Sequence, residues 1–175
     1  MGNGLPFLIA LGIGVGLSCA CAPATPASAV SASSPASTAS SLPNVTVATL
    51  RGEPTLVGQV AGGRVALVSL WATWCDACLK EMDALNRLDA NAGADAVVIG
   101  IAVGEEREKI ASFAKQRGLR YVQLVDSDFA FADAIGQRRL PATLVVDRQG
   151  RIVFRGDALD GAGLDALRKA VAGRL

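Results

Sequence analysis

Two cysteines, Cys75 and Cys78, are separated by two residues in the segment WATWCDACLKEM. The segment follows an apolar run typical of a buried strand and opens a stretch with helical periodicity, so Cys75 is predicted to lie at a helix start. Backbone N–H groups and the positive end of the helix dipole favour a thiolate there, which makes Cys75 the nucleophile. Cys78 lies one turn later and can resolve a mixed disulfide by intramolecular attack. The pair therefore predicts dithiol–disulfide exchange.

The same two thiols also suit other sites. A permanently closed structural disulfide is one alternative, and a four-cysteine zinc site with the leader cysteines, Cys19 and Cys21, is a less favoured one, because those two lie close together beyond a long linker. A copper(I)-carrying binding protein that uses the Cys pair as soft ligands is the alternative function. The chain contains no His, which excludes Ser-His-Asp and Cys-His catalysis, His-ligated metals and Cys-x-x-Cys-His haem attachment. We expect no metal and no cofactor in the domain.

Charge divides the chain into two zones. All 17 Lys and Arg and all 16 Asp and Glu lie after residue 50. The remaining part is about a quarter charged, which is ordinary for a soluble domain. The net charge of +1 gives no electrostatic reason to expect a nucleic-acid partner.

The uncharged first part has the pattern of an exported protein. Residues 5–17 form an apolar run that is too short to span a bilayer but suits an export signal. The run ends in GLSCACAP, which resembles a bacterial lipobox with Cys19 or Cys21 as the lipidated residue, and ordinary signal cleavage is the alternative. We predict a signal peptide of the lipoprotein type over 1–22 and a flexible Ala/Ser/Pro linker over 23–44. The expected location is periplasmic or otherwise extracytoplasmic, with membrane anchoring by an N-terminal lipid.

From residue 45 to residue 175, short apolar runs alternate with segments of helical periodicity, which predicts a single α/β domain with helices covering a central sheet. The predicted strands are 45–50, 65–71, 96–103, 121–125, 142–147 and 151–155, and the predicted helices are 77–92, 105–117, 128–135 and 160–172.

The segment WATWCDACLKEM, followed about 60 residues later by RRLPATLVVDRQGRIVFRGD, resembles the thioredoxin-like proteins of the TlpA and ResA group. These are exported, membrane-tethered thiol-disulfide oxidoreductases. The resemblance covers residues 45–175 and implies a thioredoxin-like fold, with a central mixed β-sheet flanked by helices. It also implies an N-terminal hairpin and an inserted strand–helix segment over 96–117.

Three further positions take their expected roles from this resemblance. Pro141 is expected to be cis, to pack against the dithiol and to present the backbone of Leu140 to the partner. Glu81, three residues after Cys78, is implicated in proton handling, and a solvent-exposed helix residue is its alternative. Thioredoxins carry a buried acid at the place held here by Ser69, so Glu81 is the remaining candidate for general acid or base.

Residues around the thiols are expected to contact the substrate. Trp74 adjoins the nucleophile and is expected to cover the dithiol and meet the partner. Asp76 and Ala77 stand between the cysteines, where an acid opposes thiolate formation and the absence of Pro leaves the first helical turn less constrained. Arg138 and Arg139 precede the expected cis proline, where they favour the thiolate or an acidic partner, and a solvated loop is the alternative.

The resemblance implies a reductant of protein disulfides, with a role in cytochrome c maturation or metalloprotein assembly. Its expected partners are protein disulfide clients and a membrane thiol reductase that supplies electrons. A thiol peroxidase is disfavoured, because Ala72 and Val68 occupy the places where that class requires Thr and Pro.

Overall fold

The computed structural model describes residues 40–174. Its strands are β1 (Ser40–Ser41), β2 (Thr46–Thr49), β3 (Pro54–Leu56), β4 (Val65–Trp71), β5 (Ala96–Val103), β6 (Val122–Asp126), β7 (Ala142–Val146) and β8 (Arg151–Gly156). Its helices are α1 (Val57–Ala61), α2 (Asp76–Asn91), α3 (Arg107–Arg117), α4 (Ala130–Ala134) and α5 (Gly161–Val171).

The strands form one mixed sheet in the order β1-β8-β7-β4-β5-β6-β2-β3. The central strands β4, β5 and β6 are parallel, and the strands on either side of them are antiparallel to their neighbours. Every residue of β4 and β5 is buried, which explains why their sequences, VALVSLW and AVVIGIAV, are nearly continuous apolar runs.

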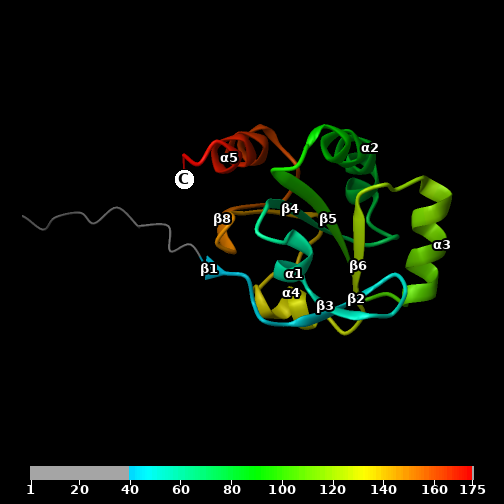
Figure 1. Ribbon diagram of the computed structural model, residues 1–175. Helices are drawn as coiled ribbons and strands as arrows, with labels where there is room; N and C mark the ends of the chain where they lie inside the picture. The colour runs from blue at the N-terminus through cyan, green and yellow to red at the C-terminus, as the bar shows by residue number, and fades with distance from the viewer. Residues whose placement is uncertain (1–39, 175) are drawn as a thin grey trace, which may run out of the picture. The chain divides into compact units, whose positions relative to one another are not determined.

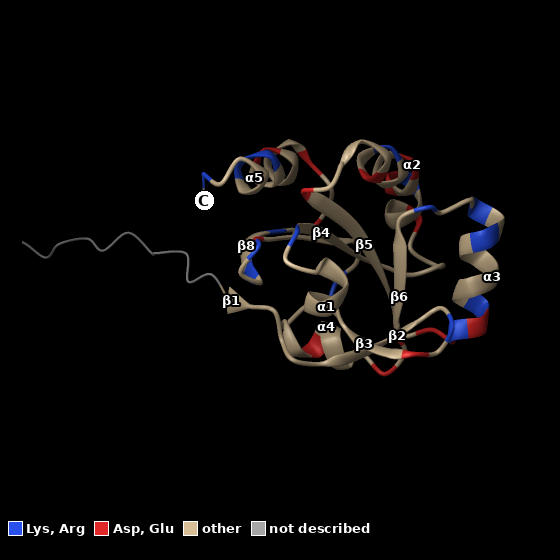
Figure 2. Ribbon diagram, in the orientation of Figure 1, with Lys and Arg blue, Asp and Glu red and all other residues tan. Residues whose placement is uncertain are grey.

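Helices cover both faces of the sheet (Figure 1). Val68 and Leu70 of β4 belong to the core that α1 and α4 cover. Leu67 and Trp71 point to the opposite face, under α2, α3 and α5. This alternation along one strand separates the two layers. Figure 2 shows that the charged positions lie mainly on helices and connecting loops, whereas the central strands carry few.

Most predicted elements are confirmed, including the N-terminal hairpin β2–β3 and the inserted pair β5–α3. The family resemblance implied this hairpin, but the sequence pattern did not locate its second strand, β3, or the helix α1, because both are too short to show a clear period. The short helix α4 also begins differently. Its N-cap is Phe129 rather than Asp128, although the Asp128 carboxylate does accept a hydrogen bond from the Ala130 N–H at 3.3 Å. Asp160 caps α5 as expected by accepting a hydrogen bond from the Gly163 N–H at 2.8 Å.

The predicted signal peptide and most of the predicted linker lie outside the described residues, as do Cys19 and Cys21. The last part of that linker segment contacts the domain: Ser40 and Ser41 pair with β8, and Leu42 packs against the core. Within residues 40–174, no helix combines the length and the apolar character needed to cross a membrane.

Candidate redox site

Cys75 and Cys78 form a disulfide at the N-terminal end of α2, with their Cα atoms 5.3 Å apart. Cys75 directly follows the loop after β4 and is the N-cap residue of α2 in an extended conformation. Its sulfur accepts a hydrogen bond from the backbone N–H of Cys78 at 3.2 Å. This contact and the helix dipole are the features that stabilise a thiolate at this position after reduction. The predicted placement of the two cysteines is therefore confirmed.

Both sulfur-bearing residues are buried, with 6% of Cys75 and 2% of Cys78 exposed. They pack in a cluster with Trp71, Met82 and Ile110 on the α2 face of the sheet. The side chain of Trp74, by contrast, is 67% exposed. An exposed aromatic side chain therefore stands next to the buried disulfide.

The peptide bond between Leu140 and Pro141 is cis, as the family resemblance implied. Pro141 is buried directly before β7, and Leu140 packs against the cluster that contains both cysteines. Asp76 and Ala77, between the cysteines, are exposed. The structure thus brings Trp74, the disulfide and Leu140 together at one end of the sheet.

Glu81 lies one turn after Cys78 and connects α2 to the loop before α5. Its Oε1 accepts a hydrogen bond from the backbone N–H of Leu159 at 3.0 Å, and its Oε2 is buried with no hydrogen-bond partner. Burial raises the pKa of the Glu81 carboxyl above its ordinary value, although the Leu159 hydrogen bond offsets part of this effect. Glu81 is therefore partly desolvated and has one oxygen free to accept a proton.

A row of polar residues crosses the sheet beneath α2. The row consists of register partners on four adjacent strands: Thr143, Ser69, Gly100 and Gln123. The indole N–H of Trp71 donates a hydrogen bond to the Gln123 side-chain oxygen at 3.1 Å. Gly100 provides the space for this contact, because a Cβ there would lie within 3.0 Å of Gln123, Tyr121 and Trp71.

The pKa of Tyr121, two residues before Gln123, is raised to about 12 by burial, and the nearby Glu81 carboxylate adds to the shift. In the described residues, the buried side-chain atoms without a hydrogen-bond partner are Glu81 Oε2, Tyr121 Oη and Thr143 Oγ1. Glu81 belongs to α2, and Thr143 is in the row of register partners beneath this helix.

A buried carboxylate that the sequence analysis did not identify fixes the loop before Cys75. Glu105, 7% exposed, accepts hydrogen bonds from the backbone N–H and the hydroxyl of Thr73, both at 2.6 Å. Lys109 forms an ion pair with the same carboxylate. Burial by itself would raise the pKa of Glu105, but the hydrogen bonds from Lys109 and Thr73 outweigh burial and hold the pKa below its ordinary value. The position of Glu105 could have been inferred from the sequence. Glu105 follows β5, and the carboxyl end of β5 lies beside the carboxyl end of β4, which Cys75 follows.

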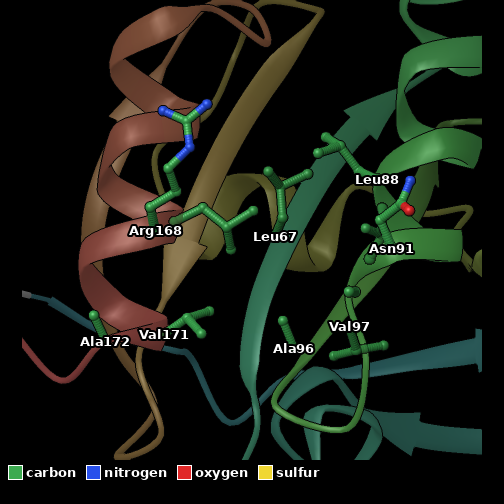
Figure 3. Close-up of a pocket in the computed structure, with 11 residues that line it drawn as sticks. Leu67, Leu88, Asn91, Ala96, Val97, Arg168, Val171 and Ala172 are labelled. Atoms are coloured by element: carbon green, nitrogen blue, oxygen red, sulfur yellow. The ribbon is translucent and has the colours of Figure 1, made fainter.

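A hollow of about 320 Å³ lies elsewhere in the described structure. Figure 3 shows Leu67 of β4, Leu88 and Asn91 of α2, and Arg168 and Val171 of α5 around it. It adjoins the C-terminal turns of α2, whereas the disulfide is at the other end of this 16-residue helix, which is roughly 24 Å long at 1.5 Å per residue. This hollow is therefore separate from the thiol chemistry.

No group of three or more His, Cys, Asp or Glu residues suited to a metal ion occurs in residues 40–174.

Comparison with known proteins relates this chain to thiol-disulfide oxidoreductases. The chain is 29% identical over 91 residues to the thiol-disulfide oxidoreductase ResA of Geobacillus thermodenitrificans, covering 51% of this chain and 52% of that protein. It is 33% identical over 94 residues to the thiol:disulfide interchange protein DsbE of Escherichia coli K12, covering 53% and 49%. The alignments thus span about half the length of these relatives.

Solved structures confirm the thioredoxin-like fold. The thioredoxin domain of a thiol-disulfide oxidoreductase from Bacteroides vulgatus matches with a TM-score of 0.66 at 22% identity, over 76% of this chain and 96% of that one. A secreted disulfide oxidoreductase of Mycobacterium tuberculosis matches with a TM-score of 0.59 at 24% identity, over 74% and 95%. The Redoxin family model matches residues 37–165, which is most of the chain. The chain therefore belongs to the Redoxin family.

Proposed function

We propose that this protein is an extracytoplasmic thiol-disulfide oxidoreductase that reduces disulfides in client proteins. The observation that carries the proposal is the Cys75 sulfur at the N-terminus of α2, within hydrogen-bond distance of the Cys78 N–H and beside the cis proline loop. The relatives named as thiol-disulfide oxidoreductases support the same chemistry.

In the proposed reaction, the reduced protein donates two electrons to the client. The Cys75 thiolate attacks one client sulfur, the client disulfide breaks, and the second client sulfur leaves as a thiolate that takes up a proton. Cys78 then loses its proton and attacks the Cys75 sulfur, which re-forms the Cys75–Cys78 disulfide and releases the client dithiol. A dithiol of a membrane thiol reductase returns the pair to the reduced state.

Glu81 is the proposed acceptor of the Cys78 proton. Its raised pKa and its unpartnered Oε2 support this role, because a carboxyl with a pKa nearer to the working pH exchanges protons more effectively. The proposed client-contact surface around the disulfide consists of Trp74, Asp76, Ala77 and Leu140.

The apolar, uncharged leader supports export, and the GLSCACAP segment supports lipid attachment at Cys19 or Cys21. A lipid anchor and a linker before residue 45 would keep the domain near a membrane electron donor. Clients of this kind include exported proteins of cytochrome c maturation and metalloprotein assembly.

Trapping the mixed disulfide tests the reaction. With Cys78→Ser, we expect mixed disulfides with client proteins to accumulate through Cys75 in cells, and with Cys75→Ser we expect none. The purified protein is expected to catalyse the reduction of insulin by dithiothreitol. Its reduction potential is expected to lie closer to that of thioredoxin, about −270 mV, than to that of DsbA, about −120 mV. Failure to trap any client, together with tight stoichiometric binding of copper(I), would instead favour the carrier function.

A further inference from the structure

A hollow of about 100 Å³ lies beside the disulfide, between the loop before α2 and the loop before β7. Its lining includes Trp74, Phe129, Arg138, Arg139 and Leu140. Drug-sized ligands occupy pockets of roughly 300 to 1,000 Å³, so this hollow has room for a single side chain and not for a small-molecule substrate.

Phe129 is held in an unusual conformation at the edge of this hollow. Its φ of 63° makes it the sole non-glycine residue with positive φ in the described structure. The carboxylate of Asp126 accepts hydrogen bonds from the Phe131 and Ala132 N–H groups at 3.0 and 2.9 Å, and the Asp126 carbonyl accepts one from the Gly104 N–H at 2.9 Å. These contacts hold the loop in place, and residues kept in such sparsely populated conformations are concentrated at binding sites.

The Phe129 ring rests on Gly104. A Cβ at Gly104 would overlap the ring, so only glycine permits this contact. Despite this support, 49% of Phe129 is exposed. The described structure has three exposed large hydrophobic residues, and two of them, Trp74 and Phe129, line this one hollow, whereas the third, Val122, does not.

Two arginine side chains, Arg138 and Arg139, give the lining of the hollow its charge. Arg138 pairs with Asp133 at 3.3 Å, with both side chains exposed. The guanidinium of Arg139 has no hydrogen-bond or ion-pair partner among residues 40–174, and Arg139 is exposed. An incoming carboxylate is the group that complements this free cation.

We infer that this hollow selects clients: it receives an aliphatic or aromatic side chain next to the client disulfide, while an acidic client residue pairs with Arg139. The inference rests on the proposed function and specifies its substrate as an extended segment with an apolar and an acidic residue flanking the reactive cysteine. Phe129 and Trp74 contact the apolar side chain from two sides, with Gly104 supporting the Phe129 ring.

Peptides with one internal disulfide test this selection. Three peptides differ only in the two residues that flank one cysteine. These residues are Leu and Glu in the first peptide, Ser and Glu in the second, and Leu and Lys in the third. The second-order rate constant for oxidation of the reduced full-length protein is measured for each peptide and for glutathione disulfide. The wild-type protein is expected to prefer the Leu peptide over the Ser peptide by about tenfold, a typical discrimination for an apolar pocket.

Phe129→Asn removes the ring while keeping a residue that tolerates positive φ. This variant is expected to lose most of the Leu preference and to react normally with glutathione disulfide. Arg139→Gln is expected to abolish the preference for Glu over Lys and to retain the Leu preference. Val122→Asn, at the far end of β6, is the matched control and should keep both preferences. Trp74→Ser, at an exposed position, provides a second ring deletion if Phe129→Asn does not fold.

The outcomes separate the two proposals. Equal use of all peptides by the wild-type protein, or an unchanged Leu preference in both ring deletions, would overturn the selection by this hollow and leave the oxidoreductase function intact. Failure to react with every peptide and with glutathione disulfide would overturn the function itself, and the selection with it.

Discussion

Glu105 accepts two hydrogen bonds of 2.6 Å from Thr73, one from its backbone N–H and one from its hydroxyl, two residues before Cys75. The loop that carries Trp74 and Cys75 is thereby attached to the segment after β5. Lys109 pairs with the same carboxylate, so its charge is balanced although the side chain is buried. Glu105 thus positions the loop that carries Cys75, the proposed nucleophile.

Glu105→Gln is expected to lower the free energy of unfolding at pH 7 by about 1 to 3 kcal/mol, because one of the buried hydrogen-bond partners is lost or weakened. The pKa of Glu105 is lowered in the folded state, so its stabilisation is present above the unfolded pKa of about 4.3 and is lost as the pH falls through the folded pKa. Urea unfolding at pH 7 and at acidic pH measures both effects. Glu106→Gln, an exposed neighbour, is the control, and an equal loss in both variants would contradict the prediction.

Glu81→Gln is expected to change the pH dependence of resolution by Cys78. Because burial raises the pKa of Glu81, the wild-type rate should show an inflection above the ordinary carboxyl range, and the variant should lack it. The measurement is release of glutathione from a mixed disulfide at Cys75 across pH. The variant should also gain stability relative to the wild type as the pH rises through the Glu81 pKa, since a buried carboxylate then forms only in the wild type. An identical profile in Glu81→Gln and in Asp83→Asn, at an exposed site on α2, would count against a role for Glu81.

Tyr121 is expected to titrate near pH 12. It is the one tyrosine of the chain, so absorbance of tyrosinate reports it without interference. An exposed tyrosine has a pKa of about 10, and the unfolded chain therefore releases this proton first. Stability is then expected to fall as the pH rises from about 10 towards 12. Glu81→Gln should lower the Tyr121 pKa slightly by removing a nearby negative charge, and a titration near pH 10 in the folded protein would refute the burial of this hydroxyl.

Gly100→Ala is expected to destabilise the protein by about 1 to 3 kcal/mol, because the new methyl group has to displace Gln123, Tyr121 or Trp71. Gly58→Ala is the matched control. An added Cβ at Gly58, within α1, meets no atom within 4 Å, so this substitution should be neutral or should stabilise the helix by up to about 1 kcal/mol. Chemical denaturation measures both variants, and equal stabilities would show that the polar row beneath α2 can rearrange without cost.

The two cysteines proposed to react could be identified without a structure. Cys75 and Cys78 are close in sequence, and the elements around them, β4 and α2, show their periods within a single continuous segment. The position of Cys75 at the helix start follows from that local order. The cis form of the bond before Pro141 followed from a family motif and not from the dipeptide itself.

Interactions between distant segments could not be predicted in this way. Glu105 lies 32 residues after Thr73, and Phe129 rests on Gly104 from another loop, so neither contact leaves a periodic pattern. The short edge strands β1 and β3 likewise form by pairing with β8 and β2. The sequence by itself determined the chemistry and its local placement, because both depend on neighbouring residues. Only the tertiary structure decided which carboxylate holds the reactive loop and which side chains line the approach to the disulfide, because adjacent parallel strands bring their following loops together at one edge of the sheet.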